Sequence, residues 1–424
     1  MRDWGAVRVA REAGAELVRA GVAGGGPMRT VIDSRSVGPG DLFVGLVGEH
    51  ADGGRFAAGG LEAGAWGVLV APEHAEAIDP ALPGAVLASP APLTSLQALA
   101  RAWRRELGAQ VIAITGSVGK TSTKDILRAL LAPQRRVHAS RANFNTEIGL
   151  PLEILAAPAD TEVLVLEMGM RGAGQIAELA AIAEPDVGVI TALGEVHLEL
   201  LGSMDAIAQA KAELVQHVRV AILPAQEPRL WPYLPAALET VFFGEDASWL
   251  DGLDLPFTSA HMRANALAAV AAARAVGVQP AGHVDLELSA MRGQVVEHRG
   301  VTVVDDCYNA NPLSMRAALD DLSSKRPAGR RVAVLGDMLE LGPQAVALHR
   351  DVGAQAARAG VDVLVTVGPL AAEMAAPFAG EAHVTADAAA AAELVAGLVA
   401  PGDLVLVKAS RGVRLEAVTE ALTR

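Results

Sequence analysis

The chain has 424 residues, of which 51% are hydrophobic and 20% charged, and its formal net charge is -14. This length allows about three domains of roughly 150 residues each, and the negative charge argues against nucleic acid and anionic lipid as partners. The single cysteine, Cys307, excludes an internal disulfide framework, and no apolar run is long enough for a signal peptide or a membrane span, so we expect a cytoplasmic protein that does not insert into membranes.

The first hundred residues consist of short segments separated by glycine and proline, as in VGPGDLFVGLVGEHADGG (37–54). This spacing of glycine and proline predicts a small α/β domain with tight turns. We place its end near residue 107, so that the first predicted domain covers residues 1–107.

The middle of the chain alternates apolar runs with helix-like stretches. The runs are VIAIT (111–115), VLVLEMG (163–169), VGVIT (187–191) and VRVAIL (218–223). Such alternation is typical of a parallel sheet with helices on its faces. The second predicted domain, with a P-loop-type parallel sheet, therefore covers residues 108–295.

A second series of apolar runs follows at VTVVDD (301–306), RVAVLG (331–336), VDVLVTVG (361–368) and DLVLVKAS (403–410). A spacing of about 30 to 40 residues matches βα units and predicts a Rossmann-like domain over residues 296–424. The alanine-rich tract at 386–400 predicts a surface helix. The fold class is therefore α/β in three domains.

A glycine-rich loop, TGSVGKTSTKD (115–125), follows the first central strand and precedes a helical pattern. Its glycines let backbone amides point at phosphate oxygens, the helix N-terminus adds partial positive charge, and Lys120 adds a full charge. Thr121 offers a hydroxyl to magnesium. A chance glycine-rich turn is the alternative, and the order of strand, loop, Gly-Lys-Thr and helix disfavours it. The residues expected to hold ATP are Gly116, Ser117, Val118, Gly119, Lys120, Thr121 and Ser122.

Polar residues follow the later strands, and the carboxyl ends of parallel strands converge on a ligand crevice. Glu167 and His197 are therefore candidates to face the phosphates, although a capping acid and a polar loop residue are equally good interpretations of each alone. Lys211, taken alone, is typical of a solvated helix lysine. Asp305 and Asp306 close a strand and fit either ribose recognition or an ordinary turn.

The sequence resembles the Mur ligase superfamily, and within it the MurF type, through strings in family order along all three predicted domains. The first domain contributes DSRSVGPGDLFVGLVGEHADGGRF (33–56), which resembles the uridine-side signature. The central domain adds TGSVGKTSTKD, NFNTEIGLP (143–151), LEMGMRGAGQI (166–176), HLELLGS (197–203) and AKAEL (210–214). The last domain adds VVDDCYNANPLSM (303–315), VLGDMLELG (334–342), HRDVG (349–353) and LVKASRG (406–412). YNANP and LGDMLELG are the most specific for the MurF type.

The resemblance implies an ATP-dependent ligase with Mg²⁺ as a cofactor. Such an enzyme adds D-alanyl-D-alanine to UDP-N-acetylmuramoyl-tripeptide in peptidoglycan precursor synthesis, and we expect a monomer. The substrate carboxylate would attack the γ-phosphate of ATP to give an acyl phosphate and ADP, and the dipeptide amine would then displace phosphate. Both steps bring anions together, so positioned cations must offset their repulsion.

The resemblance also implies a catalytic set. Lys120 and two magnesium ions would bridge the phosphates and acyl oxygens. Thr121 and Glu167 would hold one ion, and His197 and Lys211 the other, with Lys211 carbamylated by carbon dioxide so that it becomes a carboxylate-like ligand. Lys211 is therefore the sharpest test of the resemblance.

The remaining roles divide between nucleotide and substrate. The first domain would bind the UDP substrate, the second ATP, and the third would complete the ligase site. Asn265, Arg292 and Asp306 would reach the adenine, the phosphates and the ribose. The implied substrate contacts are Ser34, Arg35, Asn145, Thr146, Tyr308, Asn309 and Asn311.

Four positions depart from the usual pattern. Ile114 stands where a longer phosphate loop has a further glycine, and Val118 where Asn, Ser or Thr is common. Met262 replaces a frequent Asn, which weakens any side-chain claim about adenine there. Ala409 replaces a usual Gly, so we expect the backbone there to avoid positive φ.

Two other functions remain open from the sequence. A sister ligase with another UDP-peptide or amine would use the same chemistry and differ only in its specificity pockets. A non-catalytic nucleotide-binding module would bind ATP without forming an amide. A substrate panel distinguishes all three.

Overall fold

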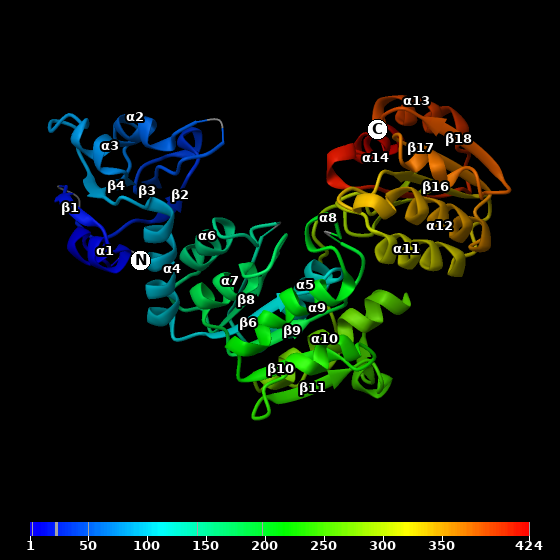
Figure 1. The fold of residues 1–424 in the computed structure, drawn as a ribbon, viewed down its shortest axis with the longest axis horizontal. Coiled ribbons are helices and arrows are strands. Elements are labelled where there is room, and N and C mark those ends of the chain that lie inside the picture. The colour runs from blue at the N-terminus through cyan, green and yellow to red at the C-terminus, as the bar shows by residue number, and fades with distance from the viewer. Residues whose placement is uncertain (2, 22–23, 50, 142, 197, 424) are drawn as a thin grey trace.

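The computed structural model describes residues 1, 3–21, 24–49, 51–141, 143–196 and 198–423. The chain forms three lobes, with the N-terminal and C-terminal lobes at opposite ends and the central lobe between them (Figure 1). Each lobe is built on its own sheet. Among the described residues, no helix combines the length and apolar character that crossing a membrane requires.

The N-terminal lobe contains a five-stranded sheet in the order β1-β5-β4-β3-β2. Strand β1 is antiparallel to β5, and the other neighbours are parallel. Its strands are β1 (Glu16–Arg19), β2 (Arg29–Val31), β3 (Asp41–Val44), β4 (Gly67–Val70) and β5 (Ala85–Ala88), and its helices α1 (Ala6–Ala13), α2 (Ala57–Glu62) and α3 (Pro72–Glu76).

Helix α4 (Pro92–Leu107) leads from this lobe into the central one and packs on both. On the N-terminal side, the ring of Trp103 meets Trp4 edge-on with centroids 5.5 Å apart. On the central side, Trp103 Nε1 donates a hydrogen bond to the Ala157 carbonyl at 3.2 Å. The helix is therefore part of both hydrophobic cores.

The central lobe contains a six-stranded, fully parallel sheet in the order β11-β10-β9-β6-β8-β7. Its strands are β6 (Gln110–Thr115), β7 (Val137–Ala139), β8 (Val163–Glu167), β9 (Val187–Ile190), β10 (Val220–Pro224) and β11 (Glu239–Phe243). Its helices are α5 (Lys120–Leu131), α6 (Gly149–Ala156), α7 (Gln175–Ala183), α8 (Leu198–Leu201), α9 (Met204–Ala212) and α10 (Ala260–Ala275), and a short parallel pair joins β12 (Leu253–Asp254) to β13 (Gly282–His283).

Strand β6 illustrates why these apolar runs form buried strands. Ile112 and Ile114 pack in the core shared with α5 and α10, whereas Val111 and Ala113 pack in the core shared with α4, α6 and α7. Because side chains alternate across a strand, a run that is apolar at every position requires cover on both faces.

The C-terminal lobe contains a six-stranded sheet in the order β14-β15-β19-β16-β17-β18, in which β14 is antiparallel to β15 and the other neighbours are parallel. Its strands are β14 (Gln294–His298), β15 (Val301–Asp305), β16 (Arg331–Gly336), β17 (Val363–Val367), β18 (Glu381–Thr385) and β19 (Leu404–Lys408). Its helices are α11 (Pro312–Ser324), α12 (Ala345–Arg358), α13 (Ala388–Leu398) and α14 (Glu416–Thr423). Helices α11 and α12 cover one face of the sheet, and α13 and α14 the other.

The α/β fold class is confirmed, and all eight apolar runs named in the sequence contain strands. The alanine-rich tract forms α13, as predicted. Strands β7, β11, β14 and β18 were not predicted. They carry exposed or half-exposed residues at most positions, because each lies at or beside a sheet edge, and so they lack a continuous apolar run.

A buried histidine fixes the turn after β16. His349 in α12 is 0% exposed, and its Nε2 accepts a hydrogen bond from the Met338 N–H at 2.9 Å. Its Nδ1 lies 2.6 Å from the Ala345 carbonyl, so Nδ1 carries the proton and the ring is neutral. Burial holds the pKa of His349 below its ordinary value, against the opposing effects of the Ala345 carbonyl, Asp337 and Glu373.

We expect acid to destabilise the protein through this ring. Because the folded-state pKa lies below the unfolded value of about 6.5, the stabilisation is complete above that pH and is lost as pH falls below it. One proton contributes a slope of at most about 1.4 kcal/mol per pH unit. Urea unfolding at several pH values should give a shallower slope for His349→Gln than for the wild type, and equal slopes would contradict this assignment.

Candidate active site

The glycine-rich loop joins β6 to α5, and its two glycines hold conformations that other residues rarely adopt. Gly116 has φ +147° and Gly119, which caps α5, has φ +88°. A Cβ atom on Gly116 would overlap Thr191 Oγ1, and one on Gly119 would overlap Asn265 Oδ1. The loop therefore requires glycine at both positions.

Hydrogen bonds hold the loop in shape before any ligand binds. The Ser117 N–H donates to the Ala192 carbonyl at 2.7 Å, and Thr191 Oγ1 donates to the Val118 carbonyl at 2.6 Å. Lys120 Nζ curls back and donates to the Gly116 carbonyl at 2.8 Å. These contacts close the loop around the N-terminus of α5, where amide groups attract anions.

The pKa of Lys120 lies below its ordinary value as the result of three effects. Burial lowers its pKa below the ordinary value, the Glu167 carboxylate raises it, and the charge of Arg292 lowers it. A bound phosphate would favour the protonated ammonium in the same way as the carboxylate does.

Glu167 ends β8 with its carboxylate held from two sides. Thr121 Oγ1 donates to Glu167 Oε2 at 2.8 Å, and Asn145 Nδ2 donates to Oε1 at 2.7 Å. Glu167 is only 2% exposed. A hydroxyl and a carboxylate in contact beside a phosphate loop are the hard oxygen ligands that Mg²⁺ prefers, so this pair fits such an ion.

Lys211 lies in α9 and is 2% exposed. Its pKa is well below the ordinary value, first because burial disfavours the charged form and second because the charge of Lys120 repels it. Within the described part of the chain, the ammonium has no hydrogen bond or ion pair. It is therefore not the solvated helix lysine that spacing alone suggests. His197, the predicted companion of Lys211, lies outside the described residues.

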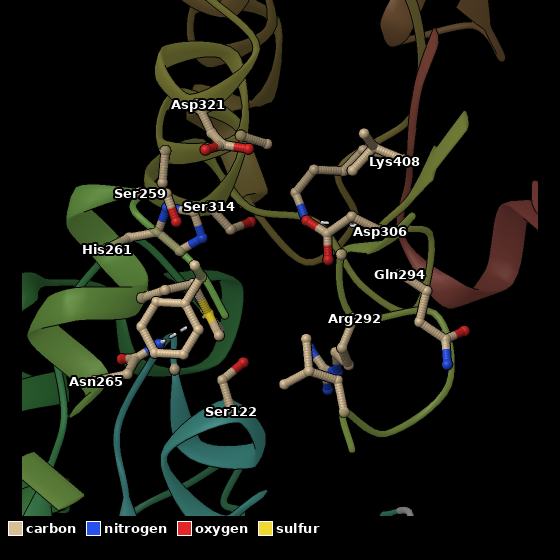
Figure 2. Close-up of a pocket in the computed structure, with 18 of the residues that line it drawn as sticks. Ser122, Ser259, His261, Asn265, Arg292, Gln294, Asp306, Ser314, Asp321 and Lys408 are labelled. Carbon is tan, nitrogen blue, oxygen red and sulfur yellow. Dashed lines mark hydrogen bonds and ion pairs between the residues drawn. The ribbon is translucent and has the colours of Figure 1, made fainter. Parts of the chain in front are cut away.

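A pocket of about 720 Å³ opens between the central and C-terminal lobes (Figure 2). All the predicted nucleotide residues of both lobes except Gly116 line its wall: Ser117, Val118, Gly119, Lys120, Thr121, Ser122, Asn265, Arg292 and Asp306. Its apolar wall includes Phe257, Met262, Leu286 and Leu288. The pocket combines a phosphate-binding end with an apolar surface, as a nucleotide requires.

The C-terminal side of the pocket carries an aligned carboxylate. Lys408 Nζ donates to Asp306 Oδ2 at 2.6 Å and to the Asn309 carbonyl at 2.9 Å. Lys408 is 2% exposed, so this bond fixes the Asp306 side chain, which Figure 2 shows beside the cavity. The Arg292 guanidinium lies 4.1 Å from the centre of the Tyr308 ring.

The other predicted residues are spread more widely. Asn309 and Asn311 line the pocket, and Asn311 also caps α11 by accepting from the Ser314 N–H at 2.9 Å. The side chain of Asn145 contacts Glu167, and Thr146 is exposed. Ser34 and Arg35 lie in the N-terminal lobe, away from the pocket, in the short helix η1 (Ser34–Ser36), where Arg35 pairs with Asp33 at 2.8 Å.

Three residues of the site were not singled out from the sequence. Thr191 supports the phosphate loop, His261 lines the pocket and Lys408 aligns Asp306. Thr191 and Lys408 are polar residues at the ends of apolar runs. Because ligands bind at the carboxyl ends of parallel strands, such residues could have been chosen as site candidates from the sequence. Ala409 adopts no positive φ, as the alanine predicted.

Comparison with known proteins agrees with this geometry. Residues 114–252 match the Mur ligase middle domain, and residues 291–411 match the Mur ligase, glutamate ligase domain. A UDP-N-acetylmuramoyl-tripeptide–D-alanyl-D-alanine ligase of Bacillus subtilis is 36% identical, over 96% of this chain and 97% of that protein. The corresponding Mycobacterium tuberculosis ligase is 39% identical, over 92% and 91%.

Solved structures give the same result. A crystal structure of MurF from Acinetobacter baumannii matches with a TM-score of 0.87 and 28% identity, covering 99% of this chain and 98% of that one. MurF ligase from Thermotoga maritima, solved in complex with ADP, matches with a TM-score of 0.79 and 30% identity, covering 93% and 96%. The chain therefore belongs to the Mur ligase family, in its UDP-N-acetylmuramoyl-tripeptide–D-alanyl-D-alanine ligase branch.

Proposed function

We propose that this chain is the ATP-dependent ligase that joins D-alanyl-D-alanine to UDP-N-acetylmuramoyl-tripeptide, with ADP and phosphate as products, in cytoplasmic peptidoglycan precursor synthesis. The observation that carries the proposal is the contact of Thr121 with Glu167, where Thr121 and Lys120 line a pocket between two lobes. The names of the relatives supply the substrates, and the ADP complex of one structural relative supports use of ATP.

We assign the phosphoryl transfer to the following residues of the chain. The amides of the phosphate loop and Lys120 would hold the β- and γ-phosphates of ATP, because they offer donors and positive charge at a helix N-terminus. Thr121 and Glu167 would hold Mg²⁺, which supplies positive charge to the phosphate oxygens when bound. Asn145 would keep the Glu167 carboxylate oriented through its 2.7 Å hydrogen bond.

Lys211 would contribute a second anionic ligand. The nitrogen lone pair of a neutral amine can add to carbon dioxide with release of one amine proton, which leaves a carbamate. The burial of Lys211 and the nearby charge of Lys120 both favour the neutral amine. The carbamate would carry a negative charge, which Lys120 would stabilise. We propose His197 as the partner of this group on the second Mg²⁺.

The remaining roles divide among three domains. We assign residues 1–107 to UDP-substrate binding through Ser34 and Arg35, and residues 108–295 to ATP binding. Residues 296–424 would complete the site around the ribose, through Asp306, and around the dipeptide, through Tyr308, Asn309 and Asn311. The UDP-binding and dipeptide-binding lobes lie at opposite ends of the molecule, so the catalytic cycle would include lobe closure in a monomer.

A product assay by mass tests this function. ADP release should depend on both the UDP-tripeptide and D-alanyl-D-alanine, and a new amide product should appear with one of three tripeptides that carry meso-diaminopimelate, lysine or another diamino acid. Product from an unrelated peptide and amine would identify a sister ligase. ATP binding without any amide product would identify a binding module.

A further inference from the structure

A buried ion pair lies in α5, one turn beyond the phosphate-loop lysine. Lys124 Nζ is 3.3 Å from Asp125 Oδ1, and the two residues are 2% and 4% exposed. Removing two charges from water is costly, and apolar residues of similar size are often as stabilising as a buried pair. Stability is therefore a weak reason for these charges to be in this position.

Lys124 connects α5 to Glu167, the carboxylate that we propose as a Mg²⁺ ligand. Its Nζ donates to the Ser140 carbonyl at 2.8 Å, and Ser140 is 2% exposed. The Ser140 hydroxyl oxygen accepts a hydrogen bond from the Glu167 N–H at 3.1 Å. Lys124 thus fixes the residue that follows β7, and that residue fixes the end of β8 where Glu167 emerges.

Asp125 connects the same helix to the segment between the two lobes. Its second oxygen, Oδ2, accepts a hydrogen bond from the Ser289 N–H at 2.8 Å. Ser289 precedes Arg292, a residue of the pocket wall, by three positions. The same helix also meets this segment through Arg128 and Glu287, but that pair is 3.7 Å apart and exposed, so it contributes little.

We propose that Lys124 and Asp125 are positioning residues for the nucleotide site. Lys124 sets the position of Glu167 through Ser140, and Asp125 sets the position of Arg292 through Ser289. The charges must be paired because each side chain has to be buried to reach its target. The inference rests on the proposed function only for what Glu167 and Arg292 bind.

Two double variants separate the connections without leaving a buried charge unpaired. Lys124→Met/Asp125→Leu removes both connections. Lys124→Met/Asp125→Asn removes the connection to Ser140 but keeps an acceptor for the Ser289 N–H. Arg128→Ala is the matched control, because it breaks the exposed contact between the same helix and the same segment.

The measurement is calorimetric binding of ADP at a series of Mg²⁺ concentrations, together with the melting temperature. It needs no turnover, so an inactive wild type would count against the proposed function and not against this inference. Both double variants should need about ten-fold more Mg²⁺ for half-maximal enhancement of ADP binding. Their melting temperatures should stay close to that of the wild type, and Arg128→Ala should match the wild type throughout.

A double-mutant cycle tests the connection through Arg292. Arg292→Ala should weaken ADP binding in the wild type and in Lys124→Met/Asp125→Asn, where the Ser289 contact is kept. It should add little in Lys124→Met/Asp125→Leu, because Arg292 is already displaced there. Equal losses from Arg292→Ala in all three backgrounds would overturn the Asp125 part of the proposal.

A simpler variant keeps the test decisive if the double variants fail to fold. Ser140→Ala removes only the hydroxyl that accepts from the Glu167 N–H. A raised Mg²⁺ requirement in this variant supports the connection from Lys124 to Glu167. Wild-type Mg²⁺ dependence in Ser140→Ala, or in a stable double variant, would overturn the Lys124 part of the proposal. If the Arg292 cycle also shows equal losses, the ion pair serves packing alone.

Discussion

Lys211→Ala should lower ligase turnover by about a hundred-fold or more, and added bicarbonate, formate or acetate should restore part of it. The wild-type side chain is buried and has a strongly lowered pKa, which suits an amine that becomes an anionic ligand. Shortening it to alanine opens a space next to Lys120 in which a small carboxylate can take the place of the carbamate. The measurement is phosphate release against carboxylate concentration.

Lys211→Met is the matched control for this rescue. Methionine fills the space that alanine leaves, so it should be equally inactive but should not respond to carboxylates. Lys211→Met should melt close to the wild type, because within the described residues the lysine forms no hydrogen bond or ion pair that would be lost and methionine fills its volume. Lys211→Ala should melt somewhat lower, because it leaves a space at a buried position. Ordinary turnover in Lys211→Ala would show that carbamylation has no part in this enzyme.

Lys120→Met should lower the rate of ADP formation by about a thousand-fold, because it removes the fixed positive charge directed at the transferred phosphate. Lys120 Nζ bonds to the Gly116 carbonyl, so the ammonium is held at the phosphate loop. The measurement is single-turnover ADP formation at saturating ATP and Mg²⁺. Affinity for the UDP-tripeptide should be unchanged, since Ser34 and Arg35 lie in another lobe.

The control for Lys120 is a substitution elsewhere in the same helix. Leu130→Ala removes apolar contact from the buried face of α5 and should lower the melting temperature while ADP formation stays near the wild-type rate. A similar loss of ADP formation in both variants would mean that the effect of Lys120→Met comes from a damaged helix and not from the missing charge.

The strands that could be predicted are those whose own residues form a continuous apolar run. A strand covered on both faces, such as β6 or β19, is apolar at nearly every position, and this signal is present in the sequence. Edge strands such as β11 and β18 are exposed or half-exposed at all but their last position and carry polar residues, so their pattern does not differ clearly from that of loops.

The site was predictable where chemistry depends on neighbours in sequence. The phosphate loop is one continuous segment, and its residues from Ser117 to Ser122 line the pocket together. Contacts between distant segments were not predictable. Asp125 and Ser289 are 164 positions apart, and Lys408 aligns Asp306 from 102 positions away. Such pairs depend on the order of strands in a sheet, which no short motif encodes.

The position of α4 determines how the molecule can move as a whole. Trp103 bonds to the central lobe while its ring packs on Trp4, and Arg8 pairs with Glu106 at 2.8 Å across the same junction. We therefore expect the first two lobes to move together and to melt as a single cooperative unit. We expect the hinge to lie in the segment after Ser289, which leads into the C-terminal lobe. A ligand bound at this hinge would then prevent lobe closure and inhibit the enzyme without competing with the UDP substrate in the N-terminal lobe.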